Sequence, residues 1–225
     1  MLDEFGSRMK EYESAFTKDN IPGNENLIIR LDGKNFSKLT KTLQKPFDLR
    51  FSEAMQDTAL TLSKEFKCDL AYTQSDEITL VFLGKPEPYQ HIFNGKIFKL
   101  NSIFAAYASV VFNKWSEGMP VFDCRAWTVP DHELSNTILW RIHDAKRNSV
   151  SACYRWILNK KKMPTQDMMK IELKENGYLY DDLSNDLKYG KMFDREFKPL
   201  DIVKFIESDW QTRQSYFLKK EIEYV

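Results

Sequence analysis

The chain has 225 residues, and its 33 lysines and arginines are balanced by 33 aspartates and glutamates, so the formal net charge is zero. This balance argues against a protein that is basic over its whole surface, but it leaves room for a local nucleic-acid patch. A hydrophobic content of 42% indicates a globular chain, the lack of a long apolar run argues against a membrane span, and the acidic residues 1–5 predict no signal peptide.

Apolar periodicity predicts alternating helices and strands over residues 1–130. Residues 2–16 carry apolar side chains at steps of three and four, which predicts an opening amphipathic helix. The next elements are expected in the order strand, helix, strand, strand, helix, strand, over about 26–32, 51–66, 69–75, 77–83, 95–115 and 121–129. That order is the split β-α-β-β-α-β arrangement, so we expect an α+β fold with an antiparallel sheet and helices on one face.

Beyond residue 130 the pattern is mostly helical. Helices are expected over about 132–159 and 165–176, and residues 192–197 alternate as in a late strand or hairpin arm. We expect a catalytic unit over residues 1–130, including the opening helix, and a helical appendage over residues 131–225, joined in one compact unit.

Three carboxylates fall at strand ends that this topology brings together. Right-handed crossovers place the first and third strands in the centre of the sheet, antiparallel to each other. The end of the first strand, with Asp32, then shares an edge with the turn that carries Asp76 and Glu77. Neighbouring acids repel each other unless a cation lies among them, which favours a Mg²⁺ site over the alternatives of an Asp-Gly turn and a solvated hairpin tip.

The loop after Asp32 is a candidate phosphate site. Residues 33–37 (GKNFS) would let backbone N–H groups approach a phosphate closely, and a helix beginning there would add its dipole. Lys45 could add a fixed positive charge, with an ordinary surface lysine as the alternative. Asp123 and Arg125 are interpreted as an ion pair on one face of the fourth strand.

A basic cluster lies between residues 138 and 162, where seven basic residues accompany a single acid, Asp144. A solvated helix face and a nucleic-acid contact are the two interpretations. The nearby aromatic residues are expected in the core rather than as platforms for bases: Trp127, Trp140, Tyr154 and Trp156. The three cysteines, far apart and without CxxC spacing, argue against a zinc site and predict reduced thiols in a cytoplasmic protein.

Several motifs together resemble the tRNA-His guanylyltransferase superfamily of 3′–5′ polymerases. Residues 30–36 (RLDGKNF), 45–48 (KPFD), 74–77 (QSDE) and 122–125 (FDCR) occur in the order and approximate spacing of that family. Residues 140–148 (WRIHDAKRN) look like the Trp-Arg-Gln-x-Asp-Ala-x-Arg-Asn segment of its archaeal and bacterial members, with isoleucine in place of the usual glutamine.

The resemblance implies a polymerase-type palm, akin to nucleotide cyclases, that uses two Mg²⁺ ions. It implies Asp32 and Asp76 as metal ligands, helped by the Gly33 carbonyl, and Glu77 as a third catalytic carboxylate. A nucleoside triphosphate would be held by Asp32, Gly33, Lys34, Asn35, Phe36, Ser37, Lys45, Ser75 and Asp76. The candidate RNA contacts are Arg141, Arg147, Asn148, Lys160, Lys161 and Lys162.

The implied reaction has two stages, ATP-dependent adenylylation of an RNA 5′-monophosphate and then attack by the 3′-hydroxyl of GTP or another nucleoside triphosphate. The His-Ile-Asn-Asn segment of eukaryotic members is absent, which favours 5′-end repair of truncated tRNA over strict action on tRNA-His. Family members are commonly homotetramers. A nucleotide cyclase-like enzyme and a tRNA-binding palm without catalysis are the rival interpretations, and the basic cluster and the intact acids argue against them, respectively.

Overall fold

The computed structural model describes residues 7–10, 12, 19–116 and 118–217. Its strands are β1 (Asn26–Lys34), β2 (Leu70–Gln74), β3 (Glu77–Phe82), β4 (Val121–Val129) and β5 (Lys191–Asp194). Its helices are α2 (Phe36–Leu39), α3 (Leu49–Phe66), α4 (Ile97–Phe112), α5 (Leu134–Ile157), α6 (Gln166–Glu175), α7 (Asn185–Tyr189), α8 (Ile202–Glu207) and α9 (Trp210–Ser215). Short 3-10 turns cover Thr40–Thr42, Ile92–Gly95, Asn113–Trp115, Asp131–Glu133 and Tyr180–Asp182.

The strands form one sheet in the order β4-β1-β3-β2-β5, and every neighbouring pair is antiparallel. The first and third strands of the chain therefore lie at the centre, as the crossover rule predicts. The α+β fold and the antiparallel sheet predicted from the sequence are confirmed.

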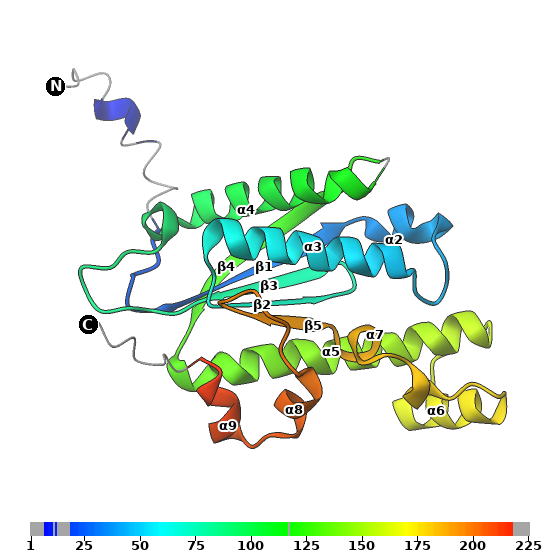
Figure 1. Ribbon diagram of the computed structural model, residues 1–225. Coiled ribbons are helices and arrows are strands. Elements are labelled where there is room, and N and C mark those ends of the chain that lie inside the picture. The colour runs from blue at the N-terminus through cyan, green and yellow to red at the C-terminus, as the bar shows by residue number, and fades with distance from the viewer. Residues whose placement is uncertain (1–6, 11, 13–18, 117, 218–225) are drawn as a thin grey trace.

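The two faces of the sheet are covered by different parts of the chain (Figure 1). Alternate side chains of β1, including Leu27, Ile29 and Leu31, pack with α3 and α4 in one hydrophobic cluster. On the other face, Ile28 packs in a second cluster with Ile138 of α5 and with residues of α8. The expected helices on one face are thus α3 and α4, and the later helices cover the opposite face.

The segment after residue 130 also contributes to the sheet itself. Strand β5 overlaps the predicted late strand, beginning one residue before it, and pairs with β2, so that Ala71 is opposite Phe193. The pairing joins segments more than 100 residues apart, which local alternation cannot reveal. A third cluster fixes α6 against the end of α5, through Leu173 and Val150. The division into two units at residue 130 stays a prediction.

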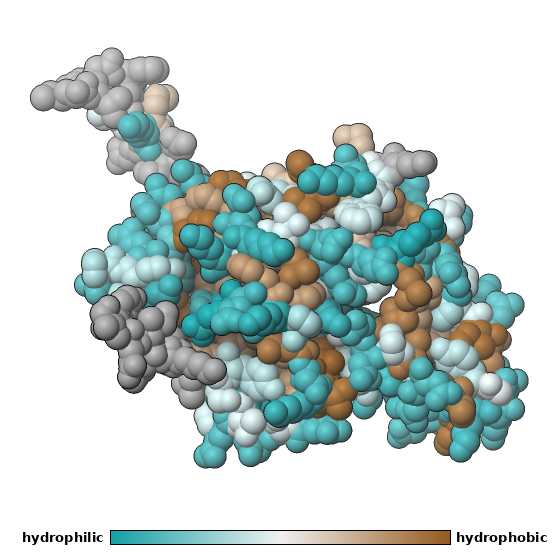
Figure 2. All heavy atoms as spheres, viewed as in Figure 1, coloured by the Kyte–Doolittle hydropathy of each residue, from teal (hydrophilic) through white to brown (hydrophobic). Residues whose placement is uncertain are grey.

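The remaining sequence expectations have mixed outcomes. Most of the opening helix falls outside the described residues, of which residues 7–10 and 12 are helical. None of the described helices has the length and apolar character needed to cross a membrane. All three cysteines are free thiols. Hydrophilic residues cover most of the face seen in Figure 2, with smaller hydrophobic areas between them.

Candidate active site

The carboxylates at the end of β1 and around the β2–β3 turn meet at one edge of the sheet. Asp32 pairs in register with Glu77 of β3 on one side and with Asp123 of β4 on the other. Asp76 lies in the turn, and its carbonyl oxygen accepts a 3.0 Å hydrogen bond from the Gly33 N–H. The topology thus brings Asp32, Asp76 and Glu77 together, as the order of the elements predicts.

An open cavity of about 390 Å³ lies over this edge, between the sheet and α5. Arg30 and Asp32 line it from the same face of β1, because side chains alternate along a strand. Trp140, Arg141 and Asp144 line it from α5. We call this space the acid cavity. It combines carboxylates from the sheet with cationic and aromatic side chains from the helix.

Asp32 and Asp76 have no cationic side chain within hydrogen-bonding distance in the part of the chain that the structure describes. Asp76 accepts a 3.1 Å hydrogen bond from the Ser75 hydroxyl. Burial, and then the negative charge of Asp123, raises the pKa of Asp32, while nearby arginines act in the opposite direction. Burial also raises the pKa of Asp76, and the charge of Asp32 adds to this effect. Ionising both carboxylates therefore costs free energy that a bound cation would offset.

Glu77 differs from the two aspartates because it has a strong partner. Arg141 donates from Nε to Oε1 at 2.7 Å and from Nη2 to Oε2 at 2.6 Å, and both side chains are less than one-tenth exposed. Burial raises the pKa of Glu77, and the two hydrogen bonds from Arg141 act in the opposite direction. This forked geometry is the strong form of an arginine–carboxylate pair, so Glu77 is a fixed carboxylate rather than a free metal ligand.

The predicted phosphate loop forms a tight turn into α2. Asn35 adopts a left-handed conformation, with φ of 60°, at the N-terminus of this short helix. The Phe36 ring is 2% exposed and packs against Phe51, Phe112 and Phe122 in the core. Phe36 could therefore contact a nucleotide only through its backbone N–H. Lys34, Asn35 and Ser37 are exposed.

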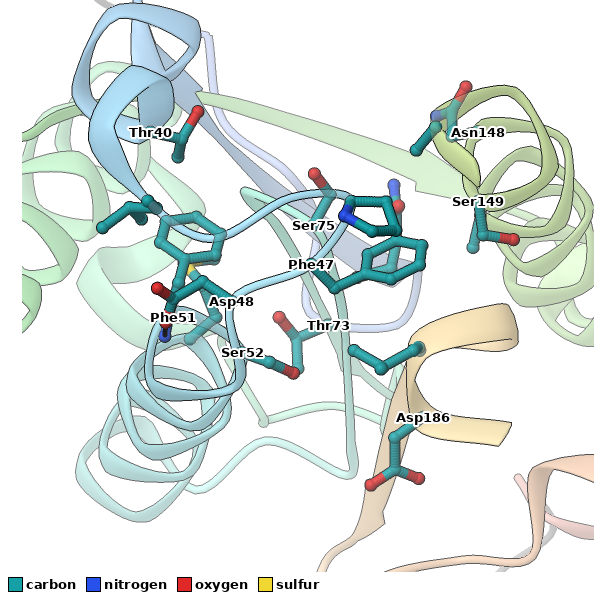
Figure 3. Close-up of a pocket in the computed structure, with 18 of the residues that line it drawn as sticks. Thr40, Phe47, Asp48, Phe51, Ser52, Thr73, Ser75, Asn148, Ser149 and Asp186 are labelled. Carbon is teal, nitrogen blue, oxygen red and sulfur yellow. Dashed lines mark hydrogen bonds between the residues drawn. The ribbon is translucent and has the colours of Figure 1, made fainter. Parts of the chain in front are cut away.

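A second, more enclosed cavity of about 220 Å³ adjoins the acid cavity (Figure 3). Thr40 and Phe51 line it from the α2–α3 side, and Ser149 and Asp186 line it from α5 and α7. Ser75 borders both cavities. A group bound in this second cavity would therefore lie next to the carboxylate edge.

Lys45 lines this second cavity but is already engaged. Its Nζ donates a 2.7 Å hydrogen bond to the Thr40 carbonyl and lies 5.2 Å from the centre of the Trp156 ring. These contacts hold the ammonium group between the loop and the end of α5. This position is compatible with Lys45 supplying positive charge to a bound triphosphate. That role stays a prediction.

The candidate RNA contacts are in three different environments. Arg141 is 7% exposed and bound to Glu77 and Asp144, so its geometry argues against the predicted phosphate contact. Arg147 and Asn148 are exposed on α5, and both donate to Asp144. The lysines 160–162 are exposed beyond the end of α5, and Lys160 forms an ion pair with Glu172. The structure therefore does not bring the predicted RNA contacts into one continuous patch of free cations.

The expectation that four aromatic residues lie in the core is wrong for two of them. Tyr154 is buried and Trp127 packs on the second cluster, whereas Trp140 is 49% exposed and Trp156 is 52% exposed. The predicted Asp123–Arg125 ion pair is present at 3.7 Å, with both side chains largely exposed.

Sequence reasoning missed Arg30 as a lining residue. Its guanidinium lies 5.8 Å from the centre of the Trp127 ring and 5.6 Å from that of Trp140. A signal was present, because Arg30 is two residues before Asp32 and must share its face of the strand.

The donor set fits Mg²⁺ bound together with a substrate. No group of three or more His, Cys, Asp or Glu side chains suited to hold a metal occurs among the described residues. Mg²⁺ usually keeps several waters and binds through one or two carboxylates plus substrate phosphates, rather than in a protein cage. Asp32 and Asp76 are such a pair, and both oxygens of the neighbouring Glu77 carboxylate are bound by Arg141.

The sequence matches the family model for tRNAHis guanylyltransferase over residues 6–130. The chain belongs to the tRNAHis guanylyltransferase family. It is therefore a nucleotidyltransferase of this family, whose reaction is 3′–5′ nucleotide addition at the 5′ end of tRNA. The matched range contains Asp32, Asp76 and Glu77 of the acid cavity.

Several known proteins and solved structures resemble the chain over most of its length. It is 30% identical to the uncharacterized protein R259 of Acanthamoeba polyphaga mimivirus, over 90% of this chain and 80% of that protein. A bacterial tRNA(His) guanylyltransferase-like protein solved in complex with ATP superposes with a TM-score of 0.83 and 27% identity, covering 95% of this chain and 98% of the other. A bacterial tRNA(His) guanylyltransferase-like protein solved in complex with GTP superposes with a TM-score of 0.78 and 28% identity, covering 96% of this chain and 97% of the other.

Proposed function

We propose that the chain repairs the 5′ ends of truncated tRNAs by adding nucleotides templated by the opposite strand. The observation that carries this proposal is the pair Asp32 and Asp76 in a cavity whose other wall is α5. Among the described residues, no cationic side chain lies within hydrogen-bonding distance of either carboxylate. Trp140, Arg141, Asp144 and Asn148 of that wall belong to the segment that resembles archaeal and bacterial members. Action on tRNA-His alone is the second candidate, favoured by the function for which the matching family model is named.

The nucleotide substrates are proposed to be ATP for activation and GTP or another nucleoside triphosphate for addition. The support is that two similar bacterial proteins were solved with ATP and with GTP. In this chain the second cavity is large enough for part of a nucleotide and adjoins the acid cavity at Ser75. The triphosphate would extend from there past the backbone of residues 33–37, with Lys45 at its side.

The protein side chains have distinct roles in this proposal. Asp32 and Asp76 would hold two Mg²⁺ ions, with the Gly33 carbonyl contributing. The metal, when bound, lowers the pKa of the attacking hydroxyl and offsets charge on the transferred phosphate. Glu77 adds negative charge beside them and is oriented by Arg141. No side chain is needed as a nucleophile, because the substrates supply both nucleophiles. An oxygen of the RNA 5′-phosphate attacks the α-phosphorus of ATP and expels pyrophosphate, and the 3′-hydroxyl of the incoming nucleotide then attacks the activated 5′-phosphate and expels AMP.

The RNA is proposed to lie along the exposed face of α5. Arg147, Lys161 and Lys162 are exposed cations on or just beyond this helix. Their charges suit the phosphate backbone, which would leave selection of the incoming base to Watson–Crick pairing. A homotetramer, which the family resemblance implies, would let a tRNA span more than one subunit.

Templated repair is tested by nucleotide addition to two truncated, 5′-monophosphorylated tRNAs. One is tRNA-His and the other is not, and each carries either C or G opposite the gap. We expect both tRNAs to be extended and the added nucleotide to follow the opposing base. Addition of G to tRNA-His alone, whatever the opposing base, would support the second candidate instead.

A further inference from the structure

A continuous series of charged contacts runs from the catalytic edge to the exposed face of α5. It begins at Glu77, next in sequence to Asp76, passes to Arg141 at 2.6 Å, and continues from Arg141 to Asp144 at 2.9 Å. Asp144 then accepts from Arg147 at 2.7 Å and from Asn148 at 3.3 Å. The helical residues are three or four positions apart, which places them on neighbouring turns of one face.

The inner end of this series of contacts, between Glu77 and Arg141, is held firmly in place. In the described part of the molecule, Arg141 is the only side chain that donates to the Glu77 carboxylate. The Trp140 ring covers the guanidinium, with its centre 4.5 Å from Cζ. Because Arg141 binds both oxygens of Glu77, moving the guanidinium would rotate or release this carboxylate.

The outer end of this series of contacts is exposed, and there Asp144 shares its carboxylate between two arginines. The Asp144 carboxylate divides its hydrogen bonds between buried Arg141 and Arg147, whose side chain is 55% exposed. An RNA phosphate that binds Arg147 and Asn148 would draw these donors away from Asp144. The freed carboxylate would then bind Arg141 alone, and so hold it more firmly against Glu77.

We propose that Arg141 is a positioning residue for Glu77, and that Asp144 couples it to RNA bound at Arg147 and Asn148. The coupling rests on the proposed function, because RNA is its effector. Its consequence is that a bound RNA prepares the catalytic edge for nucleotide transfer. We expect bound RNA to tighten nucleotide binding at that edge as well, and by linkage nucleotide must then tighten RNA binding by the same factor.

The variant Asp144→Asn distinguishes this coupling from simple electrostatic repulsion between Asp144 and RNA. If Asp144 only repelled RNA, removing its charge would lower KM for tRNA and leave kcat unchanged. Coupling predicts a fall in kcat with truncated tRNA of about two- to thirtyfold, with KM unchanged or lower. With a short 5′-phosphorylated oligonucleotide that does not reach α5, kcat of the variant should fall less than it does with tRNA, because no RNA is then bound at Arg147 and Asn148. Asp167→Asn on α6, which removes the same charge from an exposed position, serves as the control.

Arg141→Lys tests the positioning role itself. Lysine keeps the charge but cannot bind both carboxylate oxygens in a fork, so kcat should fall with tRNA and oligonucleotide alike while KM for ATP changes little. The thermal unfolding midpoint of each variant shows whether it is folded. Wild-type kcat in a folded Arg141→Lys protein would overturn the positioning role.

A binding measurement tests the coupling without turnover. The affinity for truncated tRNA is measured with and without Mg²⁺ and a non-hydrolysable ATP analogue. We expect the analogue to tighten RNA binding by about fivefold or more in wild type and to have little effect in Asp144→Asn. An equal effect in both proteins would overturn the coupling. A wild type that shows this effect but adds no nucleotide would instead contradict the proposed function.

Discussion

At the scale of single residues, the half-buried Asp32 carboxylate makes the protein less stable when it is ionised. Its folded-state pKa is raised above 3.8, so the folded chain holds this proton more tightly than the unfolded chain does. The stability that the proton contributes is present below pH 3.8 and is lost as the pH rises through the raised value. Asp32→Asn should remove this loss.

We therefore predict that Asp32→Asn raises the free energy of unfolding at pH 7 without Mg²⁺, and abolishes stabilisation by Mg²⁺ with ATP. Urea unfolding at several pH values measures the first effect, and thermal shifts measure the second. Asp57→Asn, at an exposed position of α3, is the matched control and should change neither. A less stable Asp32→Asn protein at pH 7 would show that this carboxylate is already well compensated.

Close packing of the loop onto the core leaves no room for a side chain at Gly33. A Cβ atom at this position would overlap the Phe36 ring, which is surrounded by other aromatic rings. Gly33→Ala should therefore destabilise the protein by about 1 to 3 kcal/mol and reduce nucleotide addition. Gly118→Ala is the control, because its Cβ would meet no atom closer than 3.4 Å. Equal unfolding midpoints for the two variants would contradict this account.

Residue-level chemistry was predictable only where strand order or a turn places the side chains. Asp32, Asp76 and Glu77 could be placed from strand order and the turn between strands. The pairing of Glu77 with Arg141 could not, because these residues are 64 positions apart and no periodicity links them. The same pairing changes the interpretation of Arg141, whose charge alone suggested an RNA contact.

At the scale of elements, the lysines in the segment after α5 differ in whether they form an ion pair within the protein. Lys161 and Lys162 are exposed, whereas Lys160 already pairs with Glu172 and lies over the Tyr154 ring. Replacing Lys161 and Lys162 with glutamine should reduce the slope of log affinity against log salt by about 0.7 to 0.9 for each RNA phosphate that is no longer neutralised. Lys160→Gln should change the slope less. A larger effect from Lys160→Gln alone would contradict this assignment.

The longer helices and the strands described between residues 26 and 130 were predictable because each has a strong apolar pattern, whereas α2, with four residues, is too short to carry one. The predicted strand over residues 77–83 and the observed β3 differ by one residue at the end. The position of β5 in the sheet was not predictable, since a strand of four residues carries little pattern and pairs with a distant partner. The exposure of Trp140 and Trp156 also depends on which side of α5 faces the sheet.

At the scale of the whole molecule, the sheet lies between two layers of helices. The helices α3 and α4 form one layer, and α5 with the later elements forms the other (Figure 1). The second cavity is lined from both layers, and the acid cavity lies at the sheet edge between the sheet and α5. In the proposed function, nucleotide in the second cavity and RNA along α5 would therefore meet at the same carboxylates.

The central claim is that Asp32 and Asp76 carry metal-dependent nucleotide transfer to an RNA 5′ end. The most direct measurement follows 5′-adenylylation and nucleotide addition on a truncated, 5′-monophosphorylated tRNA with Mg²⁺, ATP and labelled nucleoside triphosphates. Wild type should form both products, and Asp32→Ala and Asp76→Ala should lose both by about 100-fold or more while remaining folded. A folded variant that keeps more than about a tenth of wild-type activity would contradict the claim.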